Sequence, residues 1–81
     1  MATLAEAHVA RDVVHRKLER LLGPELDGVN AFGVAYDTRS RQPFVRVDLD
    51  QNVPVAKRRQ IPDRVHNVSV RVELLGPGVL E

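Results

Sequence analysis

The phrase Val45-Arg46-Val47-Asp48-Leu49 returns later in the chain as Val70-Arg71-Val72-Glu73-Leu74. Each copy alternates apolar and charged side chains with a period of two residues, which is typical of a β-strand with one buried face and one solvent-facing face. The two copies therefore predict two strands of one sheet, with the Val and Leu side chains in a core and the charged side chains on the opposite face.

The charges in the two copies restrict how these strands pair. Parallel neighbours in equal register would place Arg46 opposite Arg71 and Asp48 opposite Glu73, and like charges directly opposite each other are destabilising. Antiparallel neighbours would instead place Arg46 near Glu73 and Asp48 near Arg71. A further arrangement separates the copies by a more apolar strand, residues 31–37. We expect one of these last two arrangements, and the sequence leaves the choice between them open.

A long helix is predicted ahead of the strands, over residues 4–22. Thr3 and Glu6 have the spacing of a capping box. Gly23 followed by Pro24 ends the helix. Apolar residues recur between these ends at three- and four-residue spacing, and they are Ala7, Ala10, Val14, Leu18 and Leu21. We expect this apolar stripe to pack against the sheet.

Turn residues divide the remainder of the chain into strands. The strands are predicted at residues 31–37, 44–50 and 67–75, with a polar hairpin loop at 38–42 and a short helix or loop within 51–64. This order predicts a single α+β domain over residues 1–81. Its N-terminal helix is expected to pack on a three-stranded, mostly antiparallel sheet.

Composition argues against several functional classes. The chain has 81 residues, no cysteine, and 12 basic against 11 acidic residues. Without cysteine there are no disulfides, no catalytic thiolate and no thiolate ligands for iron–sulfur or zinc sites. The net charge of +1 gives no general reason to expect nucleic-acid or membrane binding. No apolar run has the length of a membrane span, so we expect a cytoplasmic protein. We also expect no cofactor.

One face of the predicted helix carries four side chains of metal-ligand type. His8, Asp12, His15 and Glu19 lie within about 60° of one another around the helix axis. They extend over three turns, so the four cannot all reach one ion, and their face points away from the apolar stripe. We interpret them as the polar face of an amphipathic helix and expect no metal site.

Positive charge is concentrated in one segment, which comprises Lys57, Arg58, Arg59 and Arg64. Loops of this kind can hold phosphates, so nucleic-acid binding through these four residues is the alternative function. No exposed aromatic platform for bases accompanies them. Catalysis finds less support, because Ser40 in a predicted loop and Ser69 in a predicted strand are not placed as a nucleophile would be. We expect no enzyme.

Residues 28–76 carry a recognisable order of features. These are Gly28-Val29, Phe32-Gly33-Val34-Ala35, Pro43-Phe44-Val45-Arg46-Val47, Ile61-Pro62 and Val68-Ser69-Val70-Arg71-Val72. In this order the segment resembles a small bacterial domain that occurs ahead of trypsin-like serine proteases and in short uncharacterised proteins. The chain departs from that pattern at His66-Asn67, where the domain usually has Gly. The resemblance implies a non-catalytic accessory, propeptide-like or partner-binding role, and no catalytic residue carries over.

A second likeness concerns small domains that help to assemble iron–sulfur clusters. Pro24-Glu25-Leu26 and Gly33-Val34-Ala35-Tyr36-Asp37 echo segments of those domains. They act through cysteine, which this chain lacks, so the likeness implies a shared α-β-β-α-β topology and not a shared function.

The function we expect from these observations is protein–protein interaction through the sheet. A partner would bind the charged face that carries Arg46, Asp48, Arg71 and Glu73, or would add a strand to an exposed edge. The partner is another protein or a second copy of this chain, because a domain with so small a core gains stability from dimerisation.

Overall fold

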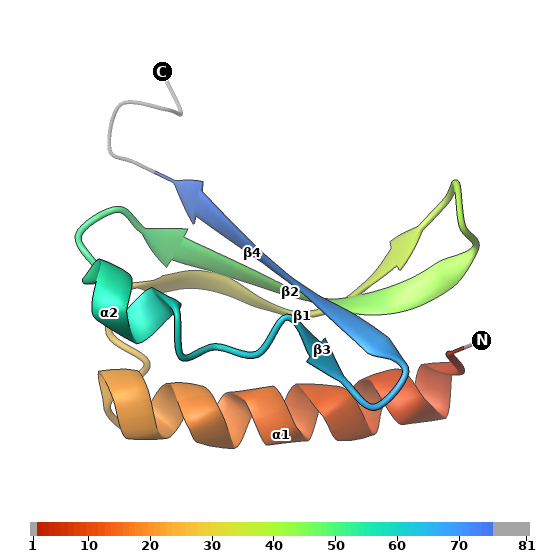
Figure 1. Ribbon diagram of the computed structural model, residues 1–81, viewed down its shortest axis with the longest axis horizontal. Coiled ribbons are helices and arrows are strands. Elements are labelled where there is room, and N and C mark those ends of the chain that lie inside the picture. The colour runs from red at the N-terminus through yellow and green to blue at the C-terminus, as the bar shows by residue number, and fades with distance from the viewer. Residues whose placement is uncertain (1, 76–81) are drawn as a thin grey trace.

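The computed structural model describes residues 2–75. Along the chain it contains α1 (Leu4–Leu22), β1 (Val29–Asp37), β2 (Gln42–Asp50), α2 (Val55–Arg58), β3 (Arg64–Val65) and β4 (Val68–Leu75). The strands form one sheet in the order β1-β2-β4-β3, and α1 lies across one of its faces (Figure 1). The α+β class is therefore confirmed, with the N-terminal helix on the sheet. The ends of the predicted domain, residues 1 and 76–81, lie outside the described residues.

The predicted helix is confirmed from its first to its last residue. Its capping box is formed, because the Thr3 backbone N–H donates to Glu6 Oε1 at 2.9 Å and the Glu6 N–H donates to Thr3 Oγ1 at 3.1 Å. At the other end the Gly23 N–H donates to the Glu19 carbonyl at 2.9 Å. The buried side of α1 consists of Ala7, Ala10, Val14 and Leu18. Local capping and the apolar stripe thus agree on one helix.

The sheet has four strands and is mixed, which corrects the expected count of three strands, while two of its three strand pairs are antiparallel as expected. β1 and β2 form an antiparallel hairpin, but β2 and β4 are parallel neighbours. Their register sets Arg46 beside Arg71 and Asp48 beside Glu73. Both expected pairings of the repeated phrase are therefore wrong, and β1 lies at the edge instead of between the copies. A parallel pair needs a long crossover connection, and residues 51–67 provide it.

The crossover contains one short helix, which was expected as a helix or a loop. It also contains one strand, β3, which the sequence did not predict. The helix α2 occupies Val55–Arg58, within the segment expected to hold a short helix or loop. The strand β3 forms a tight hairpin with β4, in which Val65 pairs with Val68. His66 turns this hairpin with a positive φ of 55°, a conformation that non-glycine residues adopt rarely.

The hydrophobic core lies between α1 and the sheet. Its largest fully buried side chains are Val14, Leu18, Val45, Val47, Leu49 and Val68. No element covers the opposite face of the sheet within residues 2–75 (Figure 1). We call that surface the open face. In the described part of the chain, no helix has the length and apolar character needed to cross a membrane.

Candidate functional site

The open face brings three of the four predicted partner-binding residues into one ion-pair cluster. Arg46 Nε donates to Asp48 Oδ1 at 2.9 Å, and Arg46 Nη2 donates to Glu73 Oε2 at 3.4 Å. Asp48 is only 3% exposed, and this guanidinium is the cation that pairs with its buried carboxylate. The carboxylates also raise the pKa of Arg46, with Asp48 as the main cause. The diagonal contact with Glu73 explains how a register of like charges is tolerated.

The fourth predicted residue, Arg71, points to a different partner. Its guanidinium lies 4.0 Å above the centre of the Phe44 ring, and its Nη2 donates to Asp37 Oδ2 at 2.5 Å. Phe44 is on β2 and Asp37 ends β1, so Arg71 reaches across a strand. The sequence did not indicate this contact, since it left the order of the strands open.

Asp37, on the open face, is an acid whose pKa is lowered by its contacts. Besides Arg71, its carboxylate accepts the backbone N–H of Arg39 at 2.9 Å and of Ser40 at 3.4 Å. These contacts, with Arg71 as the largest cause, lower the pKa of Asp37 from 3.8 to about 2. An Asp that ends a strand before a polar turn commonly accepts such bonds, and that position was the available sequence signal. The charges of the open face are thus largely satisfied by one another.

The outer edge of β1 presents unused backbone groups. The Asp50 N–H donates to the Gly28 carbonyl at 2.7 Å, so alternate residues of β2, counted back from Asp50, direct their N–H and C=O groups towards β1. The β1 residues paired with them direct their own N–H and C=O groups towards β2. The β1 residues in between direct these backbone groups outwards, away from the sheet. The outward residues are Phe32, Val34 and Tyr36. Among residues 2–75, no strand pairs with this edge.

The β1 edge also lacks the usual protection against pairing. Natural sheets shield their edges with Lys, Pro, inward-pointing charges or very short strands. Residues 29–36 contain no charged residue and no proline, and β1 is nine residues long. Only a register irregularity between Val29 and Ala31 interrupts it. Its remaining part, from Ala31 onwards, is a regular and uncharged edge.

The other edge of the sheet is better shielded. β3 covers the start of β4, and the Val70 N–H donates to the Asp63 carbonyl at 2.9 Å. The alternation along β4 then leaves only the groups of Val72 and Leu74 pointing outwards. A short free stretch offers fewer main-chain hydrogen bonds than β1, so β1 is the stronger candidate for strand addition.

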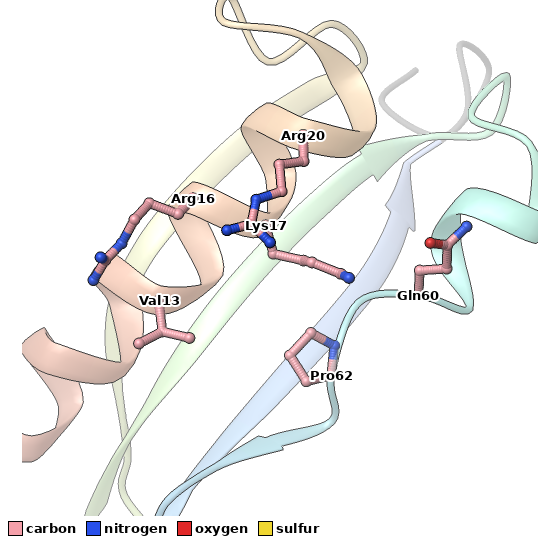
Figure 2. Close-up of a pocket in the computed structure, with 6 residues that line it drawn as sticks. All are labelled: Val13, Arg16, Lys17, Arg20, Gln60 and Pro62. Carbon is pink, nitrogen blue, oxygen red and sulfur yellow. The ribbon is translucent and has the colours of Figure 1, made fainter.

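A basic groove lies between α1 and the segment 60–62. Its volume is about 500 Å³, and it is lined by Val13, Arg16, Lys17, Arg20, Gln60 and Pro62 (Figure 2). None of the three cations forms an ion pair with a carboxylate of the described residues. The sequence reasoning missed this groove, although the spacing of Arg16, Lys17 and Arg20 places them on neighbouring positions of one helix side.

The four predicted basic residues are not part of that groove. Lys57 lines a separate hollow with Asp27 and Asp50, and Arg58 Nε donates to the Val53 carbonyl at 3.2 Å. Arg64 lies on β3. Lys57, Arg58 and Arg64 therefore each have different neighbours in the fold.

The polar helix face holds an imidazole–carboxylate pair. His15 Nδ1 lies 3.4 Å from Glu19 Oε1, and the His15 ring stacks on Phe32 at 5.8 Å between centroids. Within residues 2–75, no three His, Asp or Glu side chains are grouped as metal ligands would be.

No family model, curated protein or solved structure matches this chain.

Proposed function

We propose that this chain is a non-catalytic protein-interaction module that binds an extended strand at the outer edge of β1. One observation supports this most directly: nine consecutive residues form an edge strand whose outward N–H and C=O groups have no partner strand within residues 2–75. Strand addition would satisfy these groups, and main-chain hydrogen bonds are the source of affinity in this mode of recognition. The resemblance of residues 28–76 to a small accessory domain implies the same kind of role.

The edge is a better candidate than the charged residues of the open face. Arg46 is engaged by Asp48 and Glu73, and Arg71 is engaged by Asp37. A partner that recruited these charges would first have to break those contacts, whereas a strand added to β1 breaks none. In the proposed complex the sheet is stabilised by the ion pairs of Arg46, Asp48, Arg71 and Glu73. The edge of β1 makes the contacts with the partner.

The occupant that fits this edge best is a second copy of the same chain. In an antiparallel pair centred on Val34, the Val34 residues of the two copies face each other and Phe32 of each copy faces Tyr36 of the other. All three outward-pointing residues are then hydrogen-bonded, and aromatic cross-strand pairs are favourable. Tyr36 is 59% exposed in the single chain, so its ring is available for this contact. No charged residue between 31 and 36 opposes the pairing.

Sedimentation equilibrium tests the proposal with Val34→Pro. Proline removes the outward N–H of residue 34 but leaves the inward bonds between β1 and β2, and edge strands tolerate it. Val34→Ala is the control, because it trims the side chain and keeps the N–H. We expect a dimer for the wild type and for Val34→Ala, and a monomer for Val34→Pro. A wild type that stays monomeric at its highest soluble concentration contradicts the pairing, as does a dimer that survives the proline.

Nucleic-acid binding through Lys57, Arg58, Arg59 and Arg64 is the second candidate function. It is supported by the fact that none of these four side chains forms an ion pair with a described carboxylate. A gel shift of duplex DNA at low salt that disappears when Lys57 and Arg59 are both changed to Gln would favour this role. The absence of any shift at low salt would remove it.

A further inference from the structure

We propose that the basic groove between α1 and the segment 60–62 binds phosphate groups. This site is separate from the β1 edge and does not depend on the interaction role. Its elements are three cations from the second half of α1, the amide of Gln60, and an apolar surface formed by Val13 and Pro62. Figure 2 shows Lys17 extended from the helix towards Pro62, with the Arg20 guanidinium beside it.

The groove concentrates like charges. Arg16 and Arg20 are four residues apart on α1, and Lys17 and Arg20 are three apart, so each pair lies on adjacent turns. Like charges at these spacings destabilise a helix unless an anion lies between them. Lys17 is also half-buried, which increases the repulsion by reducing the screening by water. An anion bound in the groove would relieve it.

The carboxylates of α1 are turned elsewhere. Asp12 pairs with Arg11 at 3.2 Å, and Glu19 pairs with His15 at 3.4 Å. No acidic side chain lines the groove. Arg16 Nε donates to the Asp12 backbone carbonyl at 3.4 Å, which leaves its charge without a carboxylate. Lys17 and Arg20 are left for an external anion, in contrast to Arg46 and Arg71, whose charges are neutralised within the sheet.

The lining favours phosphate over other anions. A guanidinium presents parallel N–H donors that match two phosphate oxygens, and an ammonium acts as a compact point charge beside it. Three cations balance a ligand with two or more phosphate groups, such as a diphosphate. The volume of about 500 Å³ is within the usual range of small-molecule sites. No aromatic side chain lines the groove, so it would recognise phosphates and not a stacked base.

The groove and the β1 edge lie on different sides of α1. His15 stacks on Phe32 of β1, and Lys17 is about 160° away from His15 around the helix axis. A strand added at β1 therefore leaves the groove accessible. Phosphate binding and self-association are separate properties, and each can fail without the other.

The test is a titration of the isotope-labelled chain followed by NMR, with inorganic pyrophosphate in one arm and a short DNA duplex in the other. We expect pyrophosphate to shift the backbone amide signals of α1 around Lys17 and of Gln60. Lys17→Gln and Arg20→Gln should each weaken binding about tenfold, the usual effect of losing a hydrogen bond to a charged group. Added salt should weaken it further.

Arg39→Gln is the matched control, because it removes one exposed positive charge from the hairpin loop, away from α1. It should change the affinity less than twofold. Binding of the duplex alone, with the same dependence on Lys17 and Arg20, would identify a nucleic-acid backbone as the source of the phosphates. The proposal is overturned if neither ligand shifts these signals, or if Arg39→Gln weakens binding as much as the groove variants do. Melting temperatures of all variants show whether each one is folded.

Discussion

Arg71 on β4 and Asp37 at the end of β1 form an ion pair across the strand that separates them, with Arg71 Nη2 2.5 Å from Asp37 Oδ2. The guanidinium crosses above the ring of Phe44 on β2. The contact therefore joins the β1–β2 hairpin to the parallel strand that follows the crossover. It links three strands on the face that α1 does not cover.

Asp37→Asn should lower the stability of the chain at neutral pH but not in strong acid. The pKa of Asp37 is lowered from 3.8 to about 2 in the folded state, so the folded state holds the proton less tightly than the unfolded state does. Its stabilising contribution is complete above about pH 4 and is lost as the pH falls towards 2. We expect the melting temperature of the variant to lie below that of the wild type at pH 7, with a difference that shrinks over this window.

Asparagine keeps an oxygen acceptor for the N–H groups of Arg39 and Ser40, so the substitution tests the charge and not the turn. A difference in melting temperature that stays constant from pH 7 to pH 2 would show that the ion pair with Arg71 does not stabilise the fold.

Arg46→Gln should destabilise the chain more than Arg39→Gln, although both side chains are on the surface. Arg46 is the ion-pair partner of Asp48, whose side chain is 4% exposed, so its removal leaves a buried carboxylate without a cation. The added change Asp48→Asn should recover part of the loss, since it removes the unpaired charge. Urea denaturation of the three variants measures their unfolding free energies and so ranks the losses. Equal losses for Arg46→Gln and Arg39→Gln would contradict it.

Helix and strand positions could be predicted from this sequence because they depend on local chemistry. The capping box of Thr3 and Glu6 and the apolar stripe placed α1 correctly. The alternation in the repeated phrase identified β2 and β4 within about two residues at their ends. The pairing of these two strands was predicted wrongly. The rule that like charges avoid each other assumes direct cross-strand contact, but Arg46 and Arg71 each reach a carboxylate at a diagonal or more distant position.

The candidate sites also depend on which strands are neighbours and on how distant segments pack, neither of which the local sequence pattern determined. The length of the connection between the two copies, residues 51–67, was a usable signal for a parallel crossover, and it would have placed β1 at the edge. The groove needed the tertiary position of the segment 60–62 against α1, for which the local sequence holds no signal. The four residues expected to bind a partner form ion pairs with one another or with Asp37.

Leu18→Ala should cost about 2–5 kcal/mol of unfolding free energy. Leu18 has no exposed surface and is among the largest buried side chains between α1 and the sheet. That loss is a large part of the total stability of a small domain, which is of the order of 5–15 kcal/mol. Leu4→Ala is the control on the same helix, because Leu4 is 59% exposed and should change stability by less than about 0.5 kcal/mol. Similar losses for the two variants in urea denaturation would contradict the observed packing of α1.

Gly28→Ala should be more damaging than Gly23→Ala, although both glycines have nearly the same positive φ. The values are 89° for Gly28 and 90° for Gly23, so alanine is strained at both positions because side chains with a Cβ rarely adopt such a φ. The surroundings differ. A Cβ at residue 28 would lie 2.6 Å from Val53 Cγ2, whereas a Cβ at residue 23 would meet nothing within 4 Å. We expect Gly28→Ala to lose about 1–3 kcal/mol more, as overpacking does, and the added change Val53→Ala to return part of that difference. Equal unfolding free energies for the two single variants would show that Val53 does not pack against Gly28.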